Sequence, residues 1–467
     1  MQCFVVNSDE ITERFDSFSY TPQFKSFLNN QIKLKYSVKL GSIISSGSYG
    51  VLPPSDCYAE GGETLLVRAT ELMPDFEIDF TSSIPVPEIY YKNERARLRQ
   101  NDILLAVKGA TIASNKSVCF VEKEPLRAIV NGSIFRFQIK EGINAKYIVY
   151  ALCFENSKRQ MNLLLIANNA VNYLDRTVIN NLLIPLPPLS IQNEVVETMQ
   201  SVYNQKKQKE AEAHRLLDSI DSYVLDELGI KLPTVEDKMC FVVSSEEVKE
   251  KRADSYYYQL RFIKLIEAMR KTPFEIETLE DLSTKIINGL DFREFTKTGI
   301  PYLRVSNIKP NSFDTSDVKF IPAFSISKDI ELDSGDLLIT RKGTYGISVI
   351  VDDEHKSMVI SSEIFRIVLK KDKVNPHYIA IYLNSHILKQ LFNRISTGGI
   401  MGHISQDILK NIQIILPPLE IQNKIAEEVK RRTSEAEGLK AEANKIIEEA
   451  KKKVEKMILS DKDSKEK

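Results

Sequence analysis

The run Leu186-Pro187-Pro188-Leu189-Ser190-Ile191-Gln192-Asn193 recurs almost unchanged as Leu416-Pro417-Pro418-Leu419-Glu420-Ile421-Gln422-Asn423. In both copies a short apolar run leads into the two prolines, and a long stretch rich in charged and helix-forming residues follows them. Proline ends a strand but is tolerated in the first turn of a helix. We therefore expect each proline pair to join a strand to a long helix.

The similarity between the two copies extends outward from this junction over the whole chain. The clearest further matches, all in the same order, are residues 3–6 with 240–243, 14–17 with 252–255, 102–109 with 336–343, 134–136 with 364–366, and 147–148 with 378–379. Such an ordered series indicates a tandem duplication. The expected domains are a first module (1–188), a central helix and linker (189–232), a second module (233–418) and a distal helix (419–467).

Each module combines short β-rich runs with one helical stretch. We expect strands at 102–107, 133–139, 336–340 and 363–369, separated by Gly, Asn, Asp and Ser. The expected helical stretches are 145–164 and 376–395. Because the strands are too short and interrupted for a doubly wound sheet, the predicted fold class is α+β, with two tandem mixed α/β modules.

Apolar residues recur along both long helices at alternating steps of three and four. The expected seam residues are Val195, Met199, Val202, Ala213, Leu216, Ile220 and Tyr223 in the first helix, and Ile425, Val429, Ala436, Leu439, Ala443, Ile446, Ala450 and Met457 in the second. This spacing is typical of a coiled coil. A single helix would leave its apolar stripe in water, so we expect the two helices to pair as an antiparallel coiled coil that relates the modules by a pseudo-twofold axis. Two independent helices, each docked on its own module, are the alternative.

The bulk composition limits the class of protein. The formal net charge is −1, so overall basicity does not indicate DNA binding, although local charge still can. The five cysteines are scattered, and we expect free thiols in a reducing cytosol. Acidic residues come too early for a signal peptide, and three prolines break the longest charge-free stretch, at 177–193. A cytoplasmic protein without a membrane span is therefore predicted.

The sequence offers no catalytic constellation. It lacks a Walker A loop, a glycine motif for S-adenosylmethionine and the Asn/Asp-Pro-Pro-aromatic motif of amino-methyltransferases, and its five histidines lack metal-ligand spacing. Residues 74–77, Pro-Asp-Phe-Glu, resemble part of a metal-dependent nuclease motif without its lysine partner. Residues 46–50, Ser-Gly-Ser-Tyr-Gly, are expected to form a flexible turn. We expect a non-catalytic protein with no cofactor and no metal.

The order of module, Pro-Pro-Leu-x-x-Gln and helix, present twice, resembles the specificity (S) subunits of Type I restriction-modification systems over essentially the whole chain. Residues 335–344 and 299–308 are similar to recurring segments of the target-recognition domains of that family. The first module departs from this pattern, because residues 67–72 stand where 303–308 stand in the second. The resemblance implies two target-recognition domains that each read half of a bipartite, asymmetric DNA site, with the helices setting the spacer. The implied partners are double-stranded DNA, two methylation (M) subunits docked on the helices, and restriction (R) subunits that join the core formed by the S subunit and its two M subunits.

Base and phosphate contacts require polar or basic side chains on well-supported loops. The candidate DNA-binding residues are Ser46, Ser48, Arg68, Lys108, Asn168, Asn169 and Asn172 in the first module, and Asn288, Arg304, Arg341, Lys342, Thr344, Tyr345, Thr397, Met401 and His403 in the second. Lys108 matches Lys342, Arg68 matches Arg304, and Asn288 is assigned to the same turn as the two serines. The candidate residues for the helix junction and partner docking are Pro187, Pro188, Gln192, Pro417, Pro418 and Gln422. For each of these residues a solvated loop or a structural role is the alternative.

A coiled-coil scaffold with duplicated protein-binding modules is the competing function. The near-zero net charge favours it, whereas the recognition-type motifs favour DNA reading. A self-sufficient methyltransferase or nuclease would need the motifs that the sequence lacks.

Overall fold

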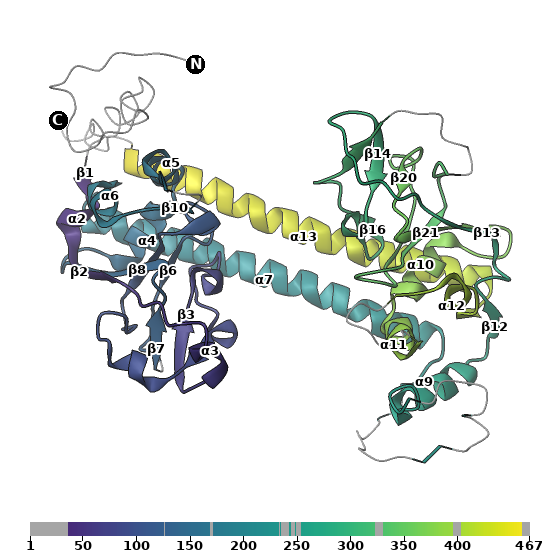
Figure 1. Ribbon diagram of the computed structural model, residues 1–467. Helices are drawn as coiled ribbons and strands as arrows, with labels where there is room; N and C mark the ends of the chain where they lie inside the picture. The colour runs from purple at the N-terminus through teal and green to yellow at the C-terminus, as the bar shows by residue number, and fades with distance from the viewer. Residues whose placement is uncertain are drawn as a thin grey trace. The chain divides into compact units, whose positions relative to one another are not determined.

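The computed structural model describes residues 36–125, 127–168, 171–232, 234, 242–243, 248, 254–322, 330–395 and 403–459. These residues form two compact units: unit 1 contains residues up to Glu210 and from Ala441 on, and unit 2 spans Ala211–Lys440 (Figure 1). Each unit therefore holds one α/β module and one half of each long helix. The matches expected at residues 3–6 and 14–17 lie outside the described residues.

The module of unit 1 contains a four-stranded sheet of order β2-β8-β5-β6 and a three-stranded sheet of order β4-β3-β7. The strands are β2 (Ile44–Tyr49), β3 (Thr64–Val67), β4 (Ile84–Val86), β5 (Ile103–Ala106), β6 (Val118–Phe120), β7 (Ala128–Val130) and β8 (Ile134–Ile139), with the pairs β1 (Ser37–Lys39)–β11 (Leu183–Pro185) and β9 (Ile166–Asn168)–β10 (Val171–Tyr173). The helices are α2 (Leu40–Ile43), α3 (Cys57–Glu60), α4 (Ala145–Cys153), α5 (Glu155–Leu164), α6 (Arg176–Asn181) and α7 (Leu189–Glu227), with short 3-10 turns η3 (Ala69–Glu71), η4 (Phe80–Ser82), η5 (Glu88–Lys92) and η6 (Gly109–Thr111).

The module of unit 2 has the same two sheets, of order β13-β21-β18-β19 and β17-β14-β20. Its strands are β13 (Ser283–Asn288), β14 (Ile300–Leu303), β17 (Lys319–Ile321), β18 (Leu337–Thr340), β19 (Ser348–Ile350), β20 (Val359–Ile360) and β21 (Ile364–Leu369), with the pairs β12 (Glu275–Thr278)–β22 (Gln413–Leu416) and β15 (Ile308–Lys309)–β16 (Ser312–Phe313). The helices are α9 (Leu260–Arg270), α10 (Pro376–Asn384), α11 (His386–Ile395), α12 (Gln406–Lys410) and α13 (Leu419–Leu459), with one 3-10 turn, η7 (Val305–Asn307).

The repeat extends to strand register and to buried charge. Leu104 in β5 pairs with Arg136 in β8, just as Leu338 in β18 pairs with Arg366 in β21. In unit 1, Nη1 of Arg136 lies 2.9 Å from Asp102. In unit 2 the corresponding guanidinium lies 2.6 Å from Asp336. The predicted fold class, a duplicated mixed α/β module with paired long helices, is confirmed.

Each predicted helical stretch is two helices rather than one. The break falls at Phe154 between α4 and α5, and at Ser385 between α10 and α11, where the backbone is extended (ψ 153° and 155°). A serine hydroxyl binds the preceding helical end in both copies: Ser157 donates to Ala151 O and Ser385 donates to Tyr382 O, each at 2.6 Å. Such local side-chain bonds compete with the helical ladder, which periodicity alone does not reveal.

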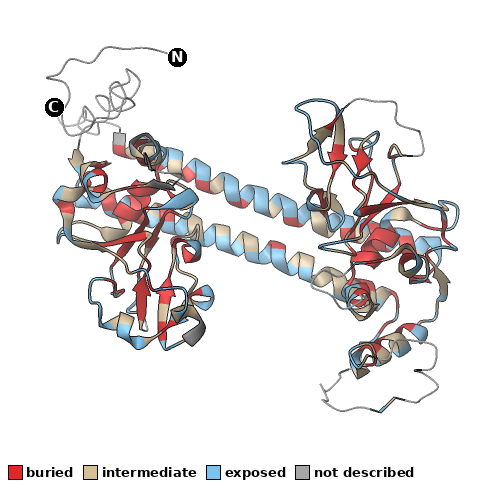
Figure 2. Ribbon diagram, viewed as in Figure 1, coloured by how far each residue is buried: buried red, intermediate tan, exposed pale blue. Residues whose placement is uncertain are grey.

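The two long helices pair antiparallel within each unit. In unit 1, Val195 and Met199 near the start of α7 share an apolar core with Val454 and Ile458 near the end of α13. In unit 2 the end of α7 shares a core with the start of α13. Figure 2 shows that buried and exposed residues alternate along both helices, whereas the inner strands β5 and β18 are buried throughout. The predicted antiparallel coiled coil is thus confirmed.

The seam differs from the expected heptad near the end of α13. Ile447 and Ile458, 6% and 4% exposed, are buried there, whereas Ile446 and Met457 are only half-buried. This part of α13 packs on the module of unit 1 as well as on α7. A second packing surface shifts the buried face away from a strict heptad.

Candidate nucleic-acid interface

Four strands of each module end at one edge, which we call the strand-end rim. It comprises residues 50–51, 67–68, 107–111 and 131–133 in unit 1, and residues 289–290, 303–304, 341–345 and 361–363 in unit 2. Backbone hydrogen bonds tie the segments together in the same way in both copies. Val107 N donates to Ser133 O at 2.8 Å, and Arg341 N donates to Glu363 O at 2.7 Å. The rim therefore places the first residues after several strands side by side.

A Lys-Gly turn occupies the same position on both rims. Lys108 and Lys342 are exposed, and within the described part of the chain neither ammonium has an ion-pair partner. Gly109 and Gly343 have φ values of 78° and 70°, a left-handed conformation that favours glycine. Among the described residues other than its two chain neighbours, none has an atom within 4 Å of the position that a Cβ on either glycine would take. Each glycine therefore has open space beside it within the described part of the chain.

The chain returns to the side of this turn at Tyr173, after α5, and at His403, after α11. The backbone of Lys108 forms an isolated β-bridge with Tyr173, which ends the hairpin that carries Asn168 and Asn172. The backbone of Lys342 forms the same kind of bridge with His403. The structure therefore places Lys108 beside the strand that carries Asn172, and Lys342 beside His403. Asn169, Thr397 and Met401 lie outside the described residues.

Arg68 and Arg304 also lie on the rim, but each is held by its own module. The backbone N of Arg68 donates to Oε2 of buried Glu71 at 2.6 Å, and Nη2 donates to Oε1 at 2.6 Å. The hydrogen bond to Glu71 raises the pKa of Arg68. Arg304 repeats the arrangement. Its backbone N donates to Oδ1 of Asn307 at 2.9 Å, and its Nη2 donates to Oδ2 of Asp317 at 2.9 Å. Both arginines cap a short helix and brace the rim.

The prediction of a flexible turn at residues 46–50 is wrong, because residues 44–49 form strand β2. Ser48 pairs with Arg136 and donates to Arg95 O at 2.6 Å. Ser46 pairs with Gln138, which lies toward the opposite edge of the sheet from Lys108. The glycine in this segment is needed for packing, since a Cβ on Gly47 would lie 2.7 Å from the Phe135 ring.

Asn288 is not the counterpart of the two serines. Ile287 pairs with Arg366 as Ser48 pairs with Arg136, so Asn288 occupies the position of Tyr49. Burial raises the pKa of Tyr49 to about 12. Its hydroxyl lies on the rim side and donates to Leu174 O at 3.3 Å.

The remaining candidates of unit 2 lie around the Lys-Gly turn. Thr344 is exposed, and its carbonyl accepts a hydrogen bond from Thr340 Oγ1 at 2.6 Å. Tyr345 donates to Asn393 Oδ1 at 3.0 Å. Arg341 is half-buried with its guanidinium carbon 5.3 Å from the centre of the Phe365 ring.

Sequence reasoning missed a basic, tyrosine-containing segment at residues 90–99 of unit 1. Arg97 and Arg127 lie over the Tyr91 ring at 4.4 and 5.6 Å. Arg95 is exposed, while its carbonyl anchors Ser48 and Arg136. Basic residues interleaved with aromatic ones are a known signal of nucleic-acid contact. Because the second copy has no obvious match to this segment, the repeat pattern does not reveal it.

The helix junctions are fixed by two buried glutamines. Gln192, 3% exposed, donates to Pro187 O at 2.7 Å and accepts from Asn144 N at 2.9 Å. Gln422, 1% exposed, makes the same two bonds with Pro417 and Asn375, at 2.8 and 2.9 Å. These buried glutamines therefore join module to helix in both copies.

Each junction exposes an apolar proline–leucine pair. Pro188 and Pro418 are exposed, and sequence reasoning missed that Leu189 and Leu419 are 45% and 42% exposed. Two equivalent apolar contacts are therefore available at the helix starts.

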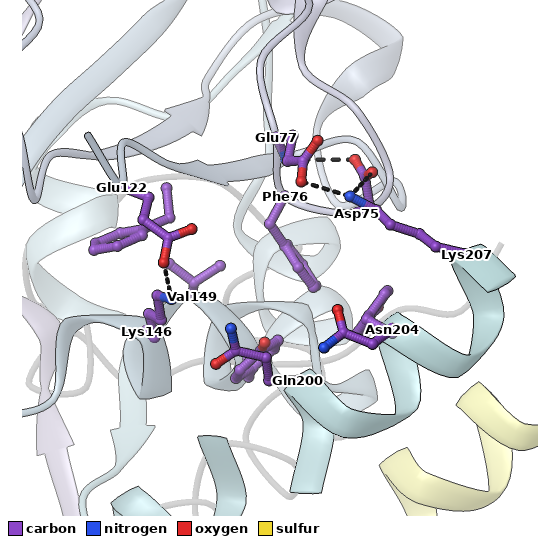
Figure 3. Close-up of a pocket in the computed structure, with 12 residues that line it drawn as sticks. Asp75, Phe76, Glu77, Glu122, Lys146, Val149, Gln200, Asn204 and Lys207 are labelled. Carbon is purple, nitrogen blue, oxygen red and sulfur yellow. Dashed lines mark hydrogen bonds and ion pairs between the residues drawn. The ribbon is translucent and has the colours of Figure 1, made fainter. Parts of the chain in front are cut away.

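The acidic turn that resembles a nuclease motif lies in unit 1 beside a pocket of about 120 Å³ (Figure 3). Lys207 reaches from α7 to Asp75 at 3.1 Å and also binds Glu77. Phe76 packs against the rings of Tyr150 and Tyr203, 5.1 and 5.0 Å away. The lysine and the aromatic contacts clamp this turn to α7.

Metal sites and membrane spans are two further kinds of feature that bear on function. No group of three or more His, Cys, Asp or Glu residues in the described ranges is placed to hold a metal ion. Within the same ranges, no helix is both long and apolar enough to cross a membrane.

Known proteins share both the sequence pattern and the fold. The Type I restriction modification DNA specificity domain matches residues 33–215 and 272–449. The Type I restriction enzyme MjaVIII specificity subunit of Methanocaldococcus jannaschii is 24% identical over 382 residues, which cover 79% of this chain and 81% of that protein. The EcoBI specificity subunit of Escherichia coli is 22% identical over 334 residues, covering 68% of this chain and 65% of that protein.

A solved chain from a study of complex assembly and conformational transition in a Type I restriction-modification system has the same fold. Its TM-score is 0.53 at 14% identity, over 92% of this chain and 99% of that chain. Since the family match covers both modules and most of both helices, the chain belongs to the Type I restriction-modification DNA specificity family, and it is a non-catalytic, DNA-binding specificity (S) subunit of such a system.

Proposed function

We propose that each module reads one half of a bipartite, asymmetric DNA site through its strand-end rim. One observation carries this proposal: the two rims have the same backbone arrangement but different side chains. Both rims present an exposed lysine on an open Lys-Gly turn, but their neighbouring residues differ, with Val107 in unit 1 and Arg341 in unit 2. Lysine contacts to phosphate set the position of a protein on DNA, and neighbouring groups read the bases.

The long helices set the spacer between the two half-sites. Helices α7 and α13, of 39 and 41 residues, each pass without a break from one unit into the other. A continuous helix has a fixed rise of about 1.5 Å per residue, so its length determines how far apart its ends are held.

Two M subunits dock on the helical region, and R subunits join the core that the S subunit and the two M subunits form. The equivalent exposed surfaces at Pro188–Leu189 and Pro418–Leu419 support this stoichiometry, because two copies of one partner need two equivalent contacts. The scaffold alternative receives no comparable support, since the family match is to a DNA specificity domain.

Co-expression with M subunits, followed by sequencing of methylated DNA, tests the proposal. A split methylated motif, made of two specific parts and a non-specific spacer, is expected. Methylation without a split motif, or none at all, would contradict bipartite reading.

Exchange experiments then separate the roles of module and helix. Replacing residues 1–188 by the first module of another family member should change one half-site only. Inserting four residues near Gln208, about 6 Å of helix, should alter the spacer and leave both half-sites unchanged. An unchanged spacer would show that the length of α7 does not set the spacer.

A further inference from the structure

The rim of unit 2 contains three buried polar atoms without a hydrogen-bond partner. They are Nε of Arg304, Nε of Arg341 and Oγ of Ser361, and they make up three of the five such side-chain atoms among the described residues. The three residues follow the ends of β14, β18 and β20. Their backbones are adjacent, since Ser361 N donates to Leu303 O at 2.9 Å and Arg341 N donates to Glu363 O. Buried polar groups are normally hydrogen-bonded, so this concentration on one rim requires an explanation.

The module fold itself does not produce this feature, because unit 1 has the same backbone without it. Nε of Arg68, the counterpart of Arg304, donates to Glu71 at 3.1 Å. Asn131 stands in place of Ser361 and accepts from Ser133 N at 2.9 Å. Val107 stands in place of Arg341 and is fully buried and apolar. The unsatisfied donors therefore belong to the sequence of the second copy.

Arg341 is the least constrained of the three residues. Within the described ranges, no carboxylate or carbonyl binds its guanidinium, and its visible contact is with the Phe365 ring. Its Nε is buried without a partner, whereas the residue as a whole is half-buried. The neighbouring turn at Lys342–Thr344 is exposed.

The geometry of a guanidinium suits one base in particular. Its planar fork donates two parallel hydrogen bonds, which match the O6 and N7 acceptors of guanine in the major groove. A phosphate contact would be served equally well by an exposed ammonium, which Lys342 already supplies. A half-buried arginine beside an aromatic ring, next to a phosphate-type lysine, fits base reading better.

We propose that Arg341 determines specificity by reading a guanine in the half-site recognised by unit 2, a contact for which unit 1 has no counterpart. This inference rests on the proposed function, because it assigns a base to one of the two reading rims.

The test compares variants of the complex with M subunits. Arg341→Val copies unit 1, and Arg341→Gln offers the amide pair that suits adenine. Lys371→Val is the matched control: it removes a cation that binds Ser334 O at the opposite edge of the same sheet. Methylated motifs are sequenced, and binding is measured on duplexes that carry each base at each position of both half-sites.

For Arg341→Val we expect discrimination at one guanine to fall about 10- to 100-fold, in one half-site only. Arg341→Gln should lose the same preference and accept adenine there, and Lys371→Val should keep the wild-type motif. Recognition of the other half-site shows that a variant is folded, and Arg341→Gln decides the matter if Arg341→Val does not fold.

Three results would overturn the inference: a half-site of unit 2 without guanine, an unchanged guanine preference in the variants, or equal weakening at every sequence, which marks a phosphate contact. If the wild-type complex shows no split motif, the proposed function has failed instead.

Discussion

Units 1 and 2 share their internal hydrogen bonds and differ in the side chains of their rims. The buried arginine–aspartate pair and the junction glutamine recur with nearly the same partners. The rims differ, by contrast, at equivalent positions. Where unit 1 has the apolar Val107, unit 2 has Arg341. Nε of Arg68 has a hydrogen-bond partner, whereas Nε of its counterpart Arg304 has none among the described residues. The copies thus repeat what builds the module and diverge in what can read a ligand.

The largest difference in stability should come from the buried ion pair. Asp102→Ala leaves Arg136 buried without a carboxylate, which costs about 3–5 kcal/mol. Asp336→Ala should cost less, about 1–3 kcal/mol, because Arg366 keeps its second ion pair, in which Nη2 lies 3.0 Å from Oδ2 of Asp333. Hydrogen exchange of each unit during denaturant unfolding of the full chain measures both free energies.

The double variant Asp333→Ala with Asp336→Ala is the control for this difference. It should raise the loss in unit 2 to the level of Asp102→Ala. Equal losses from the two single variants would show that Asp333 does not compensate.

An intermediate and equal effect is expected at the two helix junctions. Gln192→Leu and Gln422→Leu each leave a buried N–H and a carbonyl unpaired, and we expect each to cost about 2 kcal/mol. Thermal unfolding of both variants gives the comparison. Asn193→Ala is the control, because it removes only an exposed bond to Asn144 Nδ2 and should cost less than about 1 kcal/mol. A clear inequality between the two glutamine variants would mean that the junctions are not equivalent.

The duplication, the helix starts at Leu189 and Leu419 and the antiparallel pairing could all be predicted, because they depend on recurrence and periodicity. The structural role of Gln192 could not be predicted. A glutamine at this position in both copies fits partner docking and burial equally well. The mispairing of Asn288 with Ser48 has a similar origin. Strand register depends on the facing strand β21, and a shift of one residue changes which side chains are equivalent.

Arg341 shows the same limit at the candidate site. The sequence placed it among the exposed loop residues, next to Lys342, because basic residues after a strand are typical of DNA contacts. That its Nε is buried and unsatisfied, while Val107 fills the equivalent place, depends on packing between strands far apart in the chain. The loop could be found from the sequence, but the contrast between the two copies could not.

The smallest expected effect concerns the rim lysines, where the two units should behave alike. Lys108→Gln and Lys342→Gln each remove one phosphate contact, so each should weaken binding only a few-fold, and at every sequence equally. The slope of log affinity against log salt should fall by about 0.9 for each lysine and by about twice that for the double variant. Binding of the complex to its own site and to unrelated duplexes, measured over a range of salt, checks this, with Lys371→Gln as a control whose slope stays unchanged. If either rim variant altered the methylated motif, its lysine would read a base, and the division between a common phosphate contact and a copy-specific base contact would not hold for that rim.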